Sequence, residues 1–171
     1  MSLKPAVGNN DHMQGNAASN VVIVEYGDYQ CPYCGAAHPV IKQIMQEFGS
    51  QVKFVFRNFP LSEMHQYALP AALAAEAAAL QGKFWEMHDA IFEQQEYLSE
   101  PFLTEIAKSL QLNLHEFKND TGLQKLADKV DEDFESGMRS GVNGTPTFFM
   151  NGHKFQGDAT DLLERLRSGD I

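Results

Sequence analysis

The stretch "YGDYQCPYCG", Tyr26–Gly35, contains both cysteines of the chain, separated by a proline and a tyrosine. It follows "VVIVEY", an apolar β-branched run typical of a strand covered on both faces. Apolar residues at helical spacing come after it, so Cys31 lies where a strand gives way to a helix. The unpaired N–H groups and the positive dipole end of a helix N-terminus stabilise an anion at such a position. Pro32 suits the first helical position because its missing N–H would have no partner there.

Three kinds of site contain two closely spaced thiols: a metal site, an inert buried pair and a redox centre. A structural zinc site needs four ligands, but the chain has one cysteine pair and six histidines, none at ligand spacing. We therefore expect no metal, and we expect His38 to be a solvated residue of the helix. Inert packing of two thiols does not account for their position at a helix start. The motif and its position predict a redox-active Cys31–Cys34 disulfide and no other cofactor.

Cys31 is expected to be the reactive thiol of the pair. A free thiol has a pKa of about 8.5, whereas cysteines at helix starts in C-x-x-C motifs have pKa values of roughly 3.5 to 7.5. Cys34 follows one helical turn later and can close a small, strained ring with Cys31.

The rest of the chain predicts an α/β fold. "VKFVFRNF", Val52–Phe59, is typical of a second strand, and a strand, a helix and a strand in this order form a right-handed parallel βαβ unit. Asn151 and Gly152 separate two short apolar runs and predict a hairpin, which a short final helix follows. We expect one compact domain with an N-terminal lead-in at 1–20, a core at 21–62 and 141–171, and a helical insertion at 63–140.

Two details of the helical insertion follow from its sequence. Ser99 is a suitable N-cap for one of the helices. Apolar residues at three- and four-residue spacing predict a long helix near the end of the insertion. The core face of this helix is expected to contain Leu123, Leu126, Val130, Phe134 and Met138.

The composition excludes some classes of partner. The 171-residue chain has 13 basic and 23 acidic residues, a formal net charge of −10. This argues against binding to nucleic acid or to an anionic membrane, which needs clustered Lys and Arg. The most apolar run is shorter than the roughly 20 residues of a transmembrane helix. The polar N-terminus has no apolar leader, so we expect a cytoplasmic protein as the chain is written, or a periplasmic or otherwise extracytoplasmic one if a leader was removed.

The sequence "CPYC" after "VVIVEYGDYQ", together with "GVNGTPTFF" late in the chain, resembles the thioredoxin superfamily. More narrowly, the chain is similar to the bacterial DsbA-like thiol-disulfide oxidoreductases. The resemblance implies a thioredoxin-like fold, βαβ followed by ββα, with an all-helical insertion between the second and third core strands. It also implies that Cys31 attacks the substrate, that Cys34 resolves the mixed disulfide, and that the peptide bond between Thr145 and Pro146 is cis.

The resemblance extends to the surroundings of the cysteines. It implies that Pro32, Tyr33, Thr145 and Pro146 contact the substrate, with the Thr145 backbone pairing with an extended peptide. Glu25 lies six residues before Cys31, where this superfamily often has a buried acid that relays the proton of the resolving cysteine. Strand alternation also allows a plain, partly exposed carboxylate at this position, and the sequence leaves both interpretations open.

We expect an enzyme that exchanges the Cys31–Cys34 disulfide or dithiol with cysteines of protein or peptide substrates. A redox partner would recycle it, and we expect a monomer. The alternatives are a cytosolic glutaredoxin-like or thioredoxin-like disulfide reductase and a thioredoxin-like binding module without activity. Pro-Tyr stands where DsbA has Pro-His and is typical of glutaredoxins. We therefore predict an intermediate reduction potential of roughly −230 to −150 mV.

Overall fold

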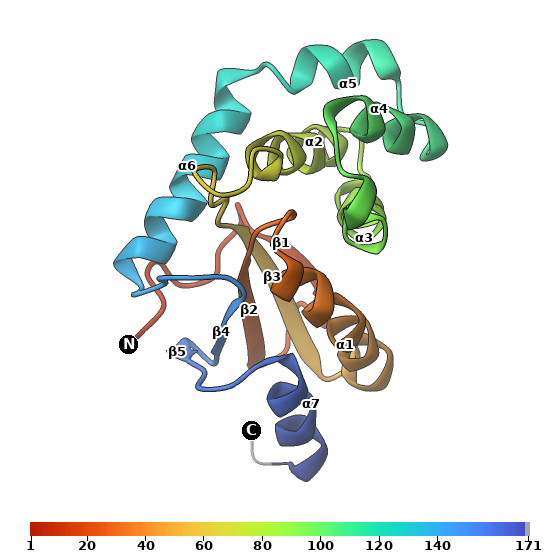
Figure 1. Ribbon diagram of the computed structural model, residues 1–171. Helices are drawn as coiled ribbons and strands as arrows, with labels where there is room; N and C mark the ends of the chain where they lie inside the picture. Colours follow the sequence, from red (N-terminus) through yellow and green to blue (C-terminus); the bar gives the residue numbers. More distant parts are fainter. Residues whose placement is uncertain (170–171) are drawn as a thin grey trace.

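The computed structural model describes residues 1–169. Its centre is a five-stranded sheet with strand order β1-β3-β2-β4-β5 (Figure 1). Strands β2 and β3 are parallel, and the other neighbouring strands are antiparallel. The strands are β1 (His12–Gly15), β2 (Val21–Gly27), β3 (Val52–Asn58), β4 (Thr147–Met150) and β5 (His153–Lys154).

The helices fall into two groups. Helices α1 and α7 pack against each other beside the sheet, and α2 to α5 gather at one end of the strands (Figure 1). The helices are α1 (Pro32–Phe48), α2 (Ala68–Leu80), α3 (Phe84–Glu93), the 3-10 helix η1 (Gln95–Tyr97), α4 (Glu100–Ser109), α5 (Leu114–Asp120), α6 (Gln124–Arg139) and α7 (Ala159–Ser168). The segment from α2 to α6 lies between β3 and β4, so the prediction of a thioredoxin-like fold with a helical insertion is confirmed.

The lead-in at 1–20 contains a strand that the sequence did not predict. Residues His12 to Gly15 form β1, which pairs antiparallel with β3, from His12 opposite Phe56 to Gly15 opposite Lys53. The segment "HMQG" is only four residues long, and Met13 is its one large apolar residue, too short a pattern to predict a strand. It becomes a strand because the edge of β3 offers unpaired N–H and C=O groups, and this is a tertiary effect.

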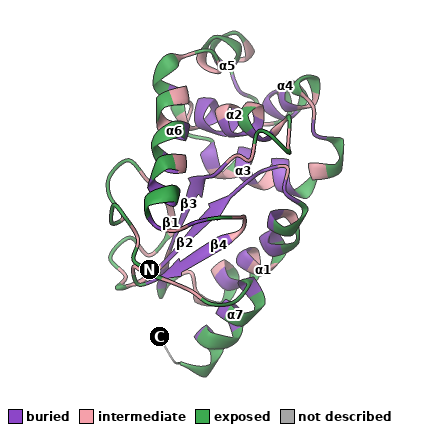
Figure 2. Ribbon diagram, turned by 60° about the vertical axis from the view of Figure 1, so that its left-hand side comes forward, coloured by how far each residue is buried: buried purple, intermediate pink, exposed green. Residues whose placement is uncertain are grey.

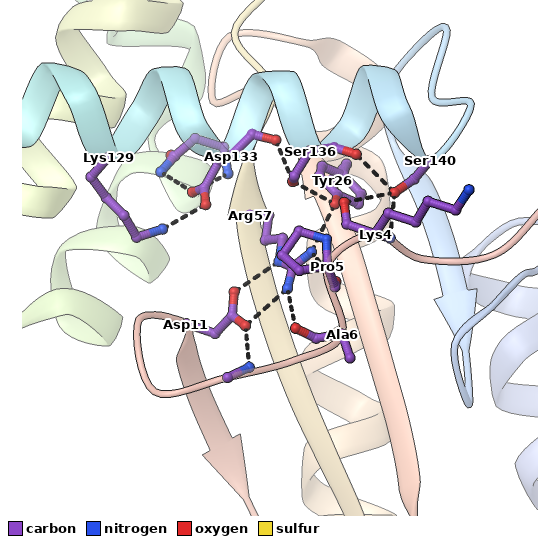
Figure 3. A network of polar contacts seen from close by, with 12 residues as sticks. Lys4, Pro5, Ala6, Asp11, Tyr26, Arg57, Lys129, Asp133, Ser136 and Ser140 are labelled. Atoms are coloured by element: carbon purple, nitrogen blue, oxygen red, sulfur yellow. Dashed lines mark hydrogen bonds and ion pairs between the residues drawn. The ribbon is translucent and has the colours of Figure 1, made fainter.

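A buried arginine holds the segment before β1 against the sheet (Figure 3). The Arg57 guanidinium donates to both carboxylate oxygens of Asp11, at 2.8 and 2.9 Å. It also donates to the Tyr26 hydroxyl at 2.9 Å and to the backbone carbonyls of Pro5 and Ala6. All five N–H donors of the guanidinium are therefore satisfied inside the protein.

The hairpin and the cap that the sequence predicts are both confirmed. Asn151 and Gly152 connect β4 to β5 with φ values of 50° and 80°, the left-handed backbone that a two-residue hairpin turn requires. The Ser99 hydroxyl accepts a hydrogen bond from the Phe102 N–H at the start of α4.

The predicted apolar stripe of α6 is right except at its end. Phe134 stacks on Phe59 with ring centroids 4.4 Å apart, but Met138 is 58% exposed. Gly137 occupies the inward position in the last turn, and a Cβ there would lie 2.7 Å from the Phe59 ring. The backbone of α6 approaches the core too closely for a side chain at this turn, so Met138 points away.

Figure 2 shows how burial is distributed over the strands and helices. The central strands are buried, whereas the helices are buried on one side and exposed on the other (Figure 2). Among residues 1–169, no helix combines the length and the apolar character needed to cross a membrane.

Candidate active site

The two cysteines lie at the junction of β2 and α1, as the sequence predicts. Cys31 is the N-cap of α1, with an extended backbone (φ −69°, ψ 121°), and Pro32 occupies the first turn. The Gly35 N–H donates to the Cys31 carbonyl at 3.1 Å. Both cysteines are free thiols, and Cys34 is fully buried behind Cys31.

The surroundings of Cys31 lower its pKa to about 5. The largest cause is a hydrogen bond from the Cys34 S–H, and the side chain of Thr145 and the backbone N–H groups of Cys34 and Tyr33 act in the same direction. Burial opposes these contacts by disfavouring the charged form. With a pKa near 5, about 99% of Cys31 is thiolate at pH 7. Cys31 is therefore a nucleophile at neutral pH.

Cys34 has the opposite character. Burial raises the pKa of its thiol far above the ordinary range, and the neighbouring Cys31 and Glu25 add to this effect. The Asp28 N–H lies 3.5 Å from its sulfur and partly compensates. The pair thus consists of one ionised sulfur at the helix start and one protonated sulfur beneath it.

The loop before β4 lies beside the cysteines, because β4 is the direct neighbour of β2 in the sheet. The predicted cis peptide bond between Thr145 and Pro146 is confirmed. When Cys31 is protonated, its S–H donates to the Thr145 carbonyl at 3.5 Å. The Thr145 hydroxyl is buried without a hydrogen-bond partner in this form, so it is a donor available to the Cys31 thiolate.

A groove of about 410 Å³ lies beside this loop. Tyr33, Thr145 and Pro146 line it together with residues of α1 and the start of α7. Tyr33 is 75% exposed, so its ring is free to contact another molecule. Pro32 is exposed next to it. Three of the four residues expected to contact substrate therefore line one groove, and the binding role of all four stays a prediction.

Glu25 is buried, so the interpretation as a partly exposed carboxylate is wrong. The alternation of buried and exposed residues does not apply, because every residue of β2 from Ile23 to Gly27 is buried and these residues point to both faces of the sheet. Burial and the nearby Cys31 raise the pKa of Glu25 to about 8. A carboxyl group that is mostly protonated at pH 7 can give a proton to a departing thiolate.

The residues before Cys31 shape the turn between β2 and α1. The Asp28 carboxylate accepts hydrogen bonds from the N–H groups of Gln30 and Leu61, at 2.7 and 2.9 Å. Its second oxygen also lies 2.8 Å from Nδ1 of His65. Tyr29 is buried, and its hydroxyl lies 2.9 Å from Nδ1 of His88. These contacts fix the turn to the loop after β3 and to the helical insertion.

The expectation that His38 is solvated is wrong. Its ring is only 6% exposed, and it stacks on Phe92 because α3 covers this face of α1. Potential ligand atoms of His38, His88 and Asp89 lie within 4.8 Å of one another, a proximity that sequence spacing did not reveal. Lys42 already pairs with Asp89, and Tyr29 with His88, so most of this group is satisfied within the protein.

Sequence reasoning also missed Gln95, which contacts the active-site loop. Its side-chain amide donates to the carbonyls of Tyr29 and Cys31, each at 2.8 Å. Gln95 lies 64 residues after Cys31, in a segment without a recognisable motif. Only the packing of the insertion against the core brings the two together.

Replacing Glu25 with glutamine should stabilise the protein in alkaline solution. The carboxyl keeps its proton up to about pH 8 in the folded state, but loses it near 4.5 when unfolded. Between these values the unfolded state binds fewer protons, so the free energy of unfolding falls as pH rises. We expect the Glu25→Gln variant to lack this fall and to be more stable at pH 9, by on the order of 2 to 4 kcal/mol.

Urea unfolding of the reduced proteins at pH 5 and pH 9 measures this difference. Glu105→Gln is the matched control, because Glu105 is exposed on α4 and loses the same charge. Equal stability of wild type and Glu25→Gln at pH 9 would mean that Glu25 is ionised at no cost, contrary to its burial.

Comparisons with known proteins agree with this geometry. A family model described as thioredoxin matches residues 8–166. A thioredoxin-like oxidoreductase from Silicibacter pomeroyi superposes with a TM-score of 0.81 at 25% identity, over 95% of this chain and 94% of that one. Oxidised BdbD from Bacillus subtilis gives 0.84 at 25% identity, over 98% and 96% of the two chains. The thiol-disulfide exchange protein α-DsbA2 from Wolbachia pipientis gives 0.81 at 23% identity, over 92% and 86%.

Some curated relatives are much longer proteins. Na(+)/H(+) antiporter NhaA 3 of Salinispora tropica is 40% identical over 153 residues, which are 90% of this chain but 23% of the antiporter. Na(+)/H(+) antiporter NhaA 1 of Mycolicibacterium vanbaalenii is 37% identical over 98% of this chain and 28% of its own length. This chain therefore spans only about a quarter of the relatives that carry the antiporter name. On its matched family model and its fold, the chain belongs to the thioredoxin family and has DsbA-type thiol-disulfide oxidoreductases as its structural neighbours.

Proposed function

We propose that this chain is a protein thiol-disulfide oxidoreductase that transfers its Cys31–Cys34 disulfide to cysteines of protein substrates. The observation that carries the proposal is the contrast between the two sulfurs: the pKa of Cys31 is lowered to about 5, and that of the buried Cys34 is raised. A stable Cys31 thiolate stabilises the dithiol form relative to the disulfide. This favours the oxidant over the alternative of a disulfide reductase.

The reaction proceeds through a mixed disulfide. A substrate thiolate attacks the Cys31 sulfur of the disulfide, and Cys34 leaves. Glu25, about nine-tenths protonated at pH 7 with its pKa near 8, gives its proton to the Cys34 thiolate. A second substrate thiolate then attacks the substrate sulfur of the mixed disulfide, and Cys31 leaves as a thiolate. Two electrons pass from the substrate thiols to the enzyme, and the substrate gains a disulfide.

The substrate is proposed to be an extended, cysteine-containing polypeptide. The groove beside Tyr33, Thr145 and Pro146 opens next to Cys31 and offers apolar and backbone surface. A peptide strand can pair with the Thr145 backbone, because Pro146 contributes no N–H of its own. A separate redox partner has to reoxidise the dithiol after each cycle. The antiporter activity named for the longer relatives is not part of this proposal, because the match covers only 23% and 28% of their length.

The reduction potential is expected to lie at roughly −230 to −150 mV. Equilibration of the protein with glutathione buffers of known ratio, followed by quantification of the disulfide, measures it. A value near that of thioredoxin, about −270 mV, would exclude the proposal of an oxidant and favour the alternative of a disulfide reductase. An absence of both peptide oxidation and insulin reduction would instead favour the binding module.

A further inference from the structure

The helical insertion reaches the active-site loop through one side chain. Gln95 lies in η1, directly after α3, and is half-buried. Its Nε2 donates to the carbonyl of Tyr29 and to the carbonyl of Cys31, at 2.8 Å each. Both N–H bonds of the amide are therefore used, and both bind the backbone on either side of Gln30. The loop that carries the reactive sulfur is thus clamped by a residue from outside the core.

Gly35 shows that this clamp is closely fitted. A Cβ at Gly35 would lie 2.3 Å from Oε1 of Gln95 and 3.0 Å from its Cδ. The Gln95 amide therefore occupies the space that a side chain at this position of α1 would need. The Cys31 carbonyl accepts hydrogen bonds both from the Gly35 N–H, at 3.1 Å, and from Gln95. The Cys31 carbonyl therefore fixes the first turn of α1 through one hydrogen bond within the helix and one to the helical insertion.

We propose that Gln95 is a positioning residue for Cys31, supplied by the helical insertion. The inference rests on the proposed function, in which Cys31 is the attacking and leaving thiolate. By fixing the carbonyls of Tyr29 and Cys31, Gln95 keeps the N–H groups of Tyr33 and Cys34 aimed at the sulfur. Those N–H groups stabilise the thiolate. Without the clamp the turn gains freedom, and the thiolate loses part of its hydrogen bonding.

Replacing Gln95 with alanine should raise the pKa of Cys31 by about 0.5 to 1. This corresponds to a roughly three- to tenfold decrease in the acid dissociation constant of the Cys31 thiol. Ultraviolet thiolate absorbance of the reduced protein, titrated against pH, measures this without any substrate. Gln94→Ala is the matched control, because the neighbouring Gln94 is exposed and, within residues 1–169, its amide donates only to the Ala90 carbonyl, at 3.4 Å. We expect the control to titrate like wild type.

Gly35→Ala provides a second route to the same displacement. The new methyl group would push the flexible end of the Gln95 side chain away, so we expect a shift in the same direction. In the double variant Gly35→Ala/Gln95→Ala the obstructing amide is gone. The combined shift should therefore be no larger than that of Gln95→Ala alone, and the two effects should not add.

The outcomes separate this inference from the proposed function. If wild-type Cys31 titrates near 5 and Gln95→Ala does the same, Gln95 has no positioning role, although the oxidoreductase stands. Loss of unfolding free energy in Gln95→Ala with an unchanged titration would also overturn the inference, since it indicates a structural role alone. If wild-type Cys31 titrates near 8.5, the value of a free thiol, the proposed function itself fails.

Discussion

The Cys31→Ser variant should exchange thiols and disulfides no faster than the uncatalysed reaction. Cys31 is the sulfur at the helix start whose pKa is lowered to about 5, and a serine hydroxyl can neither form a mixed disulfide nor leave from one. Oxidation of a peptide with two cysteines by the preoxidised wild type, compared with the variant, measures this loss. Residual turnover in Cys31→Ser well above background would show that Cys34 reacts with substrates directly.

The Cys34→Ser variant should behave differently and accumulate mixed disulfides through Cys31. Cys34 is fully buried, so a substrate sulfur reaches Cys31 first, and without Cys34 the resulting mixed disulfide is not resolved. Incubation of both variants with a disulfide-containing protein, in which the attacking thiolate forms the mixed disulfide and releases one substrate thiol, followed by nonreducing electrophoresis, compares the trapped species. Equal trapping by Cys31→Ser would reverse the assignment of the two sulfurs.

The position of the cysteine pair was predictable because its features are local. A strand, a C-x-x-C pair and a helix follow one another between Val21 and Phe48, and helix geometry alone places Cys31 at the dipole end. The hairpin at Asn151 and the cap at Ser99 are local in the same sense, since each depends on neighbours within three residues. The cis bond before Pro146 followed from the resemblance and not from the physics of the segment.

The predictions that failed or were missing depend on contacts between distant parts of the chain. Helix α3 covers His38, and both faces of β2 are buried around Glu25. Strand β1 exists because it pairs with β3, and Gln95 meets Cys31 across 64 residues. Helical or strand periodicity describes one element at a time, so it cannot show which face a second element covers. The insertion in particular gives no such signal, although it touches the active-site loop at Tyr29 and Cys31.

The N-terminal segment depends on one buried charge pair more than on its own sequence. The side chains of Arg57 and Asp11 are 3% and 8% exposed, and two hydrogen bonds of 2.8 and 2.9 Å join them. The pairing lowers the pKa of Asp11 against the opposing effect of burial, although burial is the largest single contribution. Figure 3 shows that the same guanidinium joins the lead-in to Tyr26, which in turn bonds to Ser136 of α6. Core, lead-in and insertion therefore meet at Arg57.

Replacing Arg57 with methionine should lower the free energy of unfolding by about 3 to 5 kcal/mol. Methionine fills similar volume, but it leaves the Asp11 carboxylate with the Gly8 N–H as its remaining donor and removes the donor to the Pro5 and Ala6 carbonyls. Urea unfolding at neutral pH measures the loss, and Arg139→Ala is the control, because Arg139 is 55% exposed in a surface pair worth at most about 1 kcal/mol. The double variant Arg57→Met/Asp11→Leu should regain part of the loss, since no unpaired charge remains. A change below about 1 kcal/mol for Arg57→Met would mean that water replaces the guanidinium at little cost and that the lead-in is not anchored there.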